Sequence, residues 1–136
     1  MSNAKPTVLF LCIHNAGRSQ MGAALLAEVA GDRITIHSAG SAPGEELNPA
    51  VVAALAEEGL DISGNRPQKL TEQMAIDADV VVTMGCGDAC PVYPGKRYLD
   101  WELTDPKGRS LDEVRAIRDD IRARVQTLAE ELLSEG

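Results

Sequence analysis

A cysteine and an arginine in the arrangement Cys-x5-Arg stand near the start of the chain, in Cys12-Ile13-His14-Asn15-Ala16-Gly17-Arg18-Ser19. The apolar residues 7–11 before them predict a buried strand, and residues 20–28 after them are typical of a helix. Backbone N–H groups of such a loop and of the first helical turn face one centre, where the helix dipole adds partial positive charge. The stretch therefore predicts an anion-binding loop.

The residue types in this loop suit a nucleophile that faces a bound oxyanion. The planar fork of Arg18 can bind two oxygens of a tetrahedral anion, and the same positive field favours the thiolate form of Cys12. Ser19 offers a hydroxyl to that thiolate. Asn15 tolerates left-handed backbone geometry, and Gly17 allows a positive φ. The alternative is a buried free cysteine beside a tight turn, and we favour the nucleophile.

The residues from Cys12 to Met21 resemble the anion loop of the low-molecular-weight tyrosine phosphatase superfamily, and its arsenate reductase branch more closely. Further matches lie in residues 80–86, in Cys90-Pro91 and in residues 101–106, so the resemblance covers about residues 7–133. It implies a phosphatase I-like fold and arsenate as the ligand, with phosphate or sulfate as mimics. The oxyanion-binding residues would be Ile13, His14, Asn15, Ala16, Gly17, Arg18 and Ser19.

An Asp-Pro pair, Asp105-Pro106, is predicted in a loop before the last helix. A carboxylic acid there would protonate a departing oxygen, although an ordinary Asp-Pro turn is the better interpretation of the pair alone. In the superfamily an Asp-Pro loop carries the general acid, so the resemblance implies that role for Asp105. Tyrosine phosphatases commonly place aromatic side chains at this loop, whereas residues 107–109 here are Lys, Gly and Arg. The sequence therefore favours a small inorganic anion.

Cys86 and Cys90 are the other two cysteines, and three interpretations of them stay open. They could hold zinc, which we disfavour because only two histidines could join them, and they could be small buried residues in a turn. In the third interpretation they form a thiol relay with Cys12, because reduction of arsenate needs two electrons and hence two thiols. The thioredoxin-coupled branch has a wider spacing, and Gly85 stands where its second cysteine is expected. The compact spacing resembles reductases that use mycothiol and mycoredoxin, so either external reductant is possible.

Two further residues are candidates for shaping the loop. Ser38, in a Ser-Ala-Gly sequence, is predicted to hydrogen-bond Asn15, with a surface turn as the equal alternative. His14 would line the anion site or cap the loop, and we assign it no catalytic role. No metal site and no bound cofactor are predicted.

The remaining chain predicts an α/β fold that positions these residues. Strands are expected at 7–11, 34–38, 78–83 and 97–101, and helices at 18–30, from Asn48-Pro49 to Gly59, at 71–76 and at 111–132, with a loop at 39–44. Alternation of strands and helices implies a parallel sheet, and a strand order of 2-1-3-4 gives a three-layer sandwich. The Cys12 loop and the end of the third strand would then share the carboxyl edge, where ligands bind.

The composition limits the possible classes of protein. The chain has 136 residues and a net charge of −8, which suits one domain and argues against binding to nucleic acid or anionic membranes. We expect no membrane span and no signal peptide. An odd number of cysteines fits a reducing cytoplasm. Residues 1–6 are expected to be disordered, with Ser2-Asn3-Ala4 as a tag remnant, and residues 7–136 to form the domain.

The sequence therefore predicts a cytoplasmic arsenate reductase for arsenical resistance, an oxidoreductase that uses Cys12 and a small redox protein or thiol. The alternative enzyme is a low-molecular-weight phosphatase that hydrolyses small phosphate monoesters through a phospho-cysteine, an activity that the reductase could also retain weakly. A third hypothesis is an oxyanion-binding module without turnover. Binding alone needs neither a nucleophile nor an acid, so Cys12 and Asp105 argue against it.

Overall fold

Four parallel strands form the centre of the protein in a computed structural model that describes residues 5–85 and 96–134. The inner strands are β1 (Thr7–Cys12) and β3 (Val80–Thr83), and the outer strands are β2 (Thr35–Gly40) and β4 (Arg97–Asp100). Their order in the sheet is β2-β1-β3-β4. The predicted single-domain α/β fold and the predicted strand order are both confirmed.

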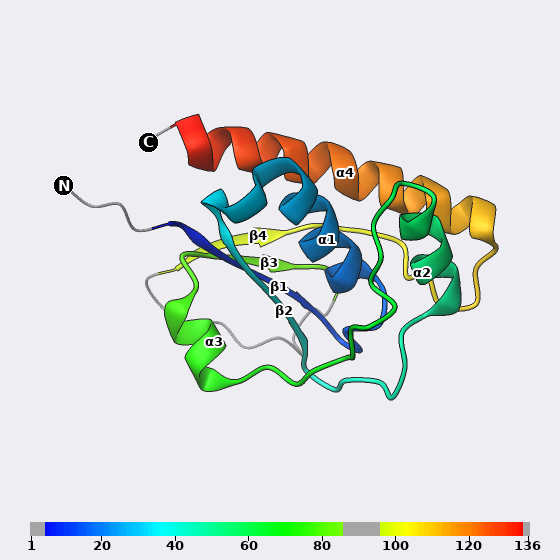
Figure 1. Cartoon of the computed structure of the whole chain (residues 1–136). Coiled ribbons are helices and arrows are strands. Elements are labelled where there is room, and N and C mark those ends of the chain that lie inside the picture. The colour runs from blue at the N-terminus through cyan, green and yellow to red at the C-terminus, as the bar shows by residue number, and fades with distance from the viewer. Residues whose placement is uncertain (1–4, 86–95, 135–136) are drawn as a thin grey trace.

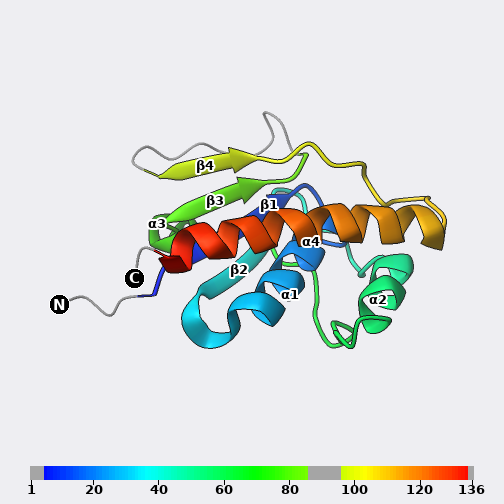
Figure 2. The ribbon, with the colours of Figure 1, turned by 90° about the horizontal axis from the view of Figure 1, so that it is seen from above.

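Helices cover both faces of this sheet. Figure 1 shows α1 (Arg18–Ala30) and α4 (Leu111–Ser134) over one face and α3 (Glu72–Asp77) over the other. Seen from above, α4 runs alongside α1 and reaches α2 (Pro49–Ala56), while a 3-10 turn (Gly31–Arg33) follows α1 (Figure 2). Within the described residues, no helix is long and apolar enough to cross a membrane.

The side chains of β1 divide between two apolar clusters because successive residues of a strand point to opposite faces. Val8 and Phe10 are fully buried in the cluster under α1 and α4, and Leu9 and Leu11 in the cluster on the α3 side. Burial on both faces is typical of an inner strand of a parallel sheet. The strand is therefore fixed firmly up to Cys12, where the loop begins.

The strand boundaries differ from the predicted ones, most clearly in β2. This strand runs to Gly40 rather than Ser38, because Ala39 pairs with Leu11 and Gly40 with Cys12. A Cβ atom at position 40 would lie 2.5 Å from the carbonyl oxygen of Ile13. The glycine that indicated a loop instead allows close approach of two backbones. Smaller differences are that β1 ends at residue 12, β2 begins at residue 35, β3 begins at residue 80 and β4 ends at residue 100.

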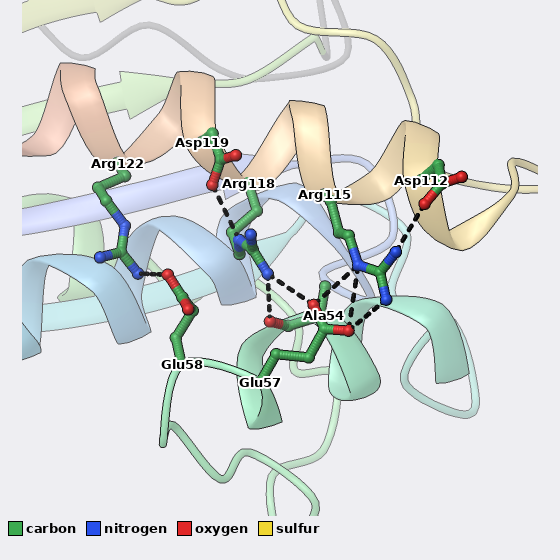
Figure 3. Close-up of polar contacts among 8 residues, drawn as sticks. All are labelled: Ala54, Glu57, Glu58, Asp112, Arg115, Arg118, Asp119 and Arg122. Carbon is green, nitrogen blue, oxygen red and sulfur yellow. Dashed lines mark hydrogen bonds and ion pairs between the residues drawn. The ribbon is translucent and has the colours of Figure 1, made fainter.

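A set of charged side chains joins α2 to α4 (Figure 3). Arg118 donates to the carbonyl oxygen of Ala54 at 2.8 Å and to Oε1 of Glu57 at 3.0 Å, and Arg115 Nε donates to the same Oε1 at 2.9 Å. The pKa of Glu57 is lowered from 4.5 to about 2, chiefly by its hydrogen bonds from Arg115, while partial burial opposes the shift and Arg118 adds to it. These contacts attach the C-terminal end of α2 to α4.

The N-terminal end of α2 begins as predicted. Asn48 is the N-cap, its side-chain oxygen accepts a hydrogen bond from the N–H of Ala50 at 2.9 Å, and Pro49 follows in the first turn. The backbone N–H of Asn48 donates to the carbonyl oxygen of Ala16 at 2.9 Å. Helix α2 therefore links the contacts with α4 to the anion-binding loop.

Candidate active site

Every backbone carbonyl from Cys12 to Gly17 accepts a hydrogen bond from a group outside the loop. Four donors are backbone N–H groups of the segment after β2, one is the N–H of a helical residue, and one is a side-chain amide. The bonds run from Ser41 N to Cys12 O (3.2 Å), Ala42 N to Ile13 O (2.9 Å), Gly44 N to His14 O (2.9 Å), Gln20 Nε2 to Asn15 O (3.1 Å), Asn48 N to Ala16 O (2.9 Å) and Met21 N to Gly17 O (2.9 Å).

These bonds determine where the amide protons of the loop point. In a planar trans peptide the C=O and the N–H that follows it point in opposite directions. Carbonyls held from outside therefore turn the N–H groups of residues 13–18 toward the inside of the loop. The N–H of Asn15 shows this directly, because it donates to Sγ of Cys12 at 3.2 Å. Such a concave set of N–H groups has the geometry to bind an anion.

The sulfur of Cys12 lies at the base of the loop with two polar neighbours. The exposed fraction of Cys12 is 2%. Sγ is 2.8 Å from Oγ of Ser19, as the sequence predicted, and accepts the N–H of Asn15. The backbone N–H of Asn15 can only donate to the sulfur, whereas in the contact with Ser19 either the hydroxyl or the sulfur can be the donor.

Asn15 adopts the predicted left-handed conformation, with φ 52°, and is fully buried. Its Oδ1 accepts the backbone N–H of Gln68 at 2.9 Å, and its Nδ2 donates to Oγ of Ser19 at 2.7 Å. The hydrogen bond predicted between Asn15 and Ser38 is not found among the described residues. Instead, Gln68 joins the two, because its Nε2 donates to the carbonyl oxygen of Ser38 at 2.7 Å.

Gly17 does not use the positive φ that a glycine allows. Its φ is −141°, and a Cβ atom there would lie 2.7 Å from Cγ of Pro106. Glycine is needed at this position because the Asp105-Pro106 loop packs against the backbone. This contact holds the loop that carries Asp105 close to the backbone of residue 17. Oδ1 of Asp105 accepts the N–H of Lys107 at 3.0 Å.

The guanidinium of Arg18 is held from two sides. Its exposed fraction is 7%, NH1 donates to the carbonyl oxygen of Leu103 at 3.4 Å, and NH2 lies 3.7 Å from Oδ2 of Asp105. On the remaining side stands Gly85, with φ 90°, where an added Cβ atom would overlap NH1 and lie 3.1 Å from Cζ. The predicted acid and the predicted anion-binding arginine therefore lie side by side.

A cavity of about 410 Å³ opens above the loop. It is lined by Cys12, Arg18 and Asp105 and, around its mouth, by apolar and charged residues such as Leu47, Glu46 and Lys107. None of its described lining residues is a phenylalanine, tyrosine or tryptophan. A larger hollow of about 790 Å³ between α1, β2 and residues 59–68 contains no cysteine among its lining residues, so the chemistry is assigned to the smaller one.

The family of this chain follows from its sequence as a whole. Residues 7–136 match the family described as low molecular weight phosphotyrosine protein phosphatase. The chain belongs to this family. Arsenate reductase 1 of Staphylococcus epidermidis is 35% identical over 129 residues, which cover 92% of this chain and 96% of the relative. The glutaredoxin arsenate reductase of Synechocystis is 33% identical over 124 residues, covering 89% of this chain and 94% of the relative.

A solved structure of the phosphatase fold is also similar. The thioredoxin-dependent arsenate reductase of Corynebacterium glutamicum superposes with a TM-score of 0.83 at 43% identity and covers 97% of this chain. This chain spans 63% of the length of that one. Family and fold thus agree with the loop from which the resemblance was first drawn.

Within this phosphatase-family loop the predicted anion-binding residues play unequal parts. His14, Ala16 and Gly17 line the cavity together with Arg18. The side chain of Ile13 instead packs against the apolar cluster on the α3 side, so only its backbone is available to a ligand. Cys86 and Cys90 lie outside the described residues.

Sequence reasoning missed two residues that support the phosphatase loop, Gln20 and Gln68. Gln20, in α1, donates from its side-chain amide to the carbonyl oxygen of Asn15. Gln68, in the segment before α3, donates from its backbone N–H to Oδ1 of Asn15. Gln20 could have been suspected, because a buried position in the first turn of a helix is an unusual place for a glutamine. Nothing in the sequence distinguishes Gln68 from a surface residue.

Proposed function

We propose that this protein reduces arsenate to arsenite with Cys12 as the nucleophile. The observation that carries the proposal is the loop from Cys12 to Arg18, whose carbonyls are all held from outside while the sulfur lies at its base. A tetrahedral oxyanion suits a concave set of N–H groups beside a guanidinium. The arsenate reductases among its relatives confirm the predicted class of enzyme.

The first step forms a bond between sulfur and arsenic. The Cys12 thiolate donates an electron pair to arsenic, one As–O bond breaks, and the departing oxygen leaves as water with a proton from Asp105. The side-chain exposure of Asp105 is 50%, which gives it access to protons from solvent, and it stands within 3.7 Å of Arg18. Arg18 and the backbone N–H groups stabilise the charge on the remaining oxygens.

The second step transfers two electrons to arsenic. A second thiolate attacks Sγ of Cys12, a disulfide forms, and the electron pair of the S–As bond stays on arsenic, which changes from As(V) to As(III). Arsenite leaves, and two thiols are oxidised for each arsenite formed. An external thiol reductant then restores the enzyme.

The identity of the second thiol is a finer proposal. We infer that Cys86 supplies it and that Cys90 then attacks the resulting disulfide, with mycothiol and mycoredoxin or thioredoxin as the reductant. One relative is thioredoxin-dependent and another uses glutaredoxin, which supports a small redox protein as partner. The close contact of Gly85 with Arg18 supports a thiol after this position rather than at it. Such chemistry requires reduced thiols, so we propose a cytoplasmic location.

Variants of the two cysteines test this relay. Arsenite release is measured in a single turnover by Cys86→Ser and by Cys90→Ser, each with and without added small thiol. The internal relay predicts that Cys86→Ser releases no arsenite in either condition. Wild-type release by both variants under a small thiol and its redoxin would contradict the internal relay and assign the attack to the small thiol.

Phosphatase activity is the weaker candidate. Hydrolysis of phosphotyrosine needs the aromatic ring of the substrate to be held at the mouth of the site, and the described lining has no Phe, Tyr or Trp side chain for it to pack against. We therefore expect slow hydrolysis of small aryl phosphates and poor hydrolysis of phosphotyrosine peptides. Steady-state rates with arsenate, an aryl phosphate and a phosphotyrosine peptide decide between the two activities. Efficient phosphotyrosine hydrolysis without arsenate reduction would contradict the proposal.

A further inference from the structure

Gln20 is a buried polar residue to which the reaction described above assigns no step. It lies in the first turn of α1, with an exposed fraction of 4%. Its Nε2 donates to the carbonyl oxygen of Asn15 and to Oδ1 of the same residue, both at 3.1 Å. Its Oε1 accepts Nδ2 of Asn65 at 3.2 Å. The side chain thus uses its donor and its acceptor on two different segments.

We propose that Gln20, held by Asn65, is a positioning residue that keeps Asn15 and Ser19 oriented to donate hydrogen bonds to Cys12. The proposal rests on the assignment of Cys12 as the nucleophile. Gln20 supplies the one carbonyl contact of the loop that comes from a side chain, while the other five come from backbone N–H groups. It is therefore the contact that a substitution can remove without changing the backbone.

The orientations of the two side-chain amides in this chain, those of Asn15 and Gln20, are fixed by backbone groups. Oδ1 of Asn15 accepts the backbone N–H of Gln68, which can only donate, so the amide of Asn15 must turn Nδ2 toward Ser19. The carbonyl oxygen of Asn15 can only accept, so Gln20 must turn Nε2 toward it and Oε1 toward Asn65. Neither amide can flip without placing two donors or two acceptors face to face.

The same logic sets the hydroxyl of Ser19. Its oxygen accepts Nδ2 of Asn15 at 2.7 Å, and its own proton is free to point at Sγ of Cys12, 2.8 Å away. Donors then follow one another from Asn65 through Gln20, Asn15 and Ser19 to the sulfur. A thiolate at the end of this chain receives a donor, whereas a thiol competes for the same contact.

Replacing Gln20 removes its hydrogen bonds to Asn15 or replaces them with repulsion. In Gln20→Glu a carboxylate oxygen would face the two oxygens of Asn15, so repulsion replaces two hydrogen bonds and the loop loses a restraint. Gln20→Met keeps the approximate volume and removes both donors. Asn65→Ala removes only the outermost contact, from an exposed residue. Gln73→Glu is the matched control, because it makes the same charge change at an exposed position of α3, where Gln73 donates to Asp77 and to no other described residue.

The readout is the pH dependence of alkylation of Cys12 by iodoacetamide, measured on the Cys12 peptide by mass spectrometry. The ratio of the rate at pH 6 to the rate at pH 8 reports the thiolate fraction and does not require arsenate turnover. We expect this ratio to fall roughly tenfold in Gln20→Glu, less in Gln20→Met, and least in Asn65→Ala. Inorganic phosphate should bind more weakly in the same order, and Gln73→Glu should match the wild type in both measurements.

Thermal unfolding and circular dichroism separate this effect from loss of fold. Gln20→Met and Asn65→Ala carry the test where Gln20→Glu does not fold. An unchanged alkylation ratio in folded Gln20→Met would overturn the proposal, as would an equal change in Gln73→Glu. Failure of the wild type to reduce arsenate would contradict the proposed function alone, because the alkylation ratio and phosphate binding still test the role of Gln20.

Discussion

The guanidinium of Arg18 fills the space that a side chain at Gly85 would need. An added Cβ atom would overlap NH1 and lie 3.1 Å from Cζ, and the carbonyl of Leu103 holds the guanidinium from another side. The glycine two residues after β3 and the arginine at the start of α1 therefore constrain each other. A cysteine at position 85 itself would displace Arg18.

Gly85→Ala should displace Arg18 and lower activity more than stability. The methyl group would push the guanidinium from its place, and a misplacement of about 1 Å at a catalytic group costs roughly 100-fold in kcat/KM. Gly59→Ala is the control, since Gly59 also has a positive φ of 77° but an added Cβ atom meets nothing within 4 Å. Both variants carry a similar backbone strain of about 1 kcal/mol. Equal kcat/KM in the two variants would contradict the constraint.

Arg18→Lys should lose most of the activity. A lysine keeps the charge but cannot bind two oxygens with a planar fork, and loss of one well-placed stabilising donor costs about 100-fold or more in kcat. The measurement is kcat and KM for arsenate, with the exposed Arg66→Lys as control for the same exchange. A kcat for Arg18→Lys near that of the control would show that charge alone suffices.

Asp105→Asn should slow the formation of the S–As bond. Asparagine keeps the shape and can still accept the N–H of Lys107, but it has no proton for the departing oxygen. Loss of a general acid typically lowers kcat by about 10²–10⁴-fold. Phosphate binding should change little or improve, because a negative charge near Arg18 is removed. Retention of wild-type kcat would exclude Asp105 as the acid.

The contacts of Glu57 predict a pH dependence of stability. Its folded-state pKa of about 2 lies below the ordinary 4.5, so the carboxylate stabilises the fold fully above about pH 4.5, and this contribution is lost as the pH falls toward 2. Glu57→Gln should therefore destabilise the protein at pH 7 and lose less stability between pH 4.5 and pH 2. Urea denaturation at pH 7, 4 and 3 measures both effects, and parallel curves for variant and wild type would refute this linkage.

The sheet and the chemical residues could be predicted from the sequence because local patterns specify them. Apolar runs mark the inner strands, and Cys12 and Arg18 stand on either side of a strand-to-helix turn. The exact end of β2 was not predictable, because the glycine at position 40 is required by the close approach of the Ile13 backbone and not by a turn. Gly17 shows the same difficulty, because the close contact with Pro106, and not a positive φ, requires glycine there.

The supporting contacts of the loop could not be predicted because they join segments far apart in the chain. Gln68 reaches Asn15 across 53 positions, and Asn65 reaches Gln20 across 45. A single sequence holds no local signal for a hydrogen bond of this kind. Ser38 was predicted as a direct partner of Asn15, and it does lie near Asn15. The two residues are connected through Gln68, which donates hydrogen bonds to both.

The stoichiometry of thiol loss tests the central claim most directly. Fully reduced protein is mixed anaerobically with arsenate and one equivalent of a small thiol, arsenite is quantified, and free thiols and disulfides are identified by mass spectrometry. Whatever thiol acts second, we predict two thiols lost for each arsenite formed, with Cys12 in the first disulfide and no arsenite from Cys12→Ser. Arsenite formed at the wild-type level by Cys12→Ser, or arsenate bound by the wild type without thiol loss, would contradict the proposed reaction.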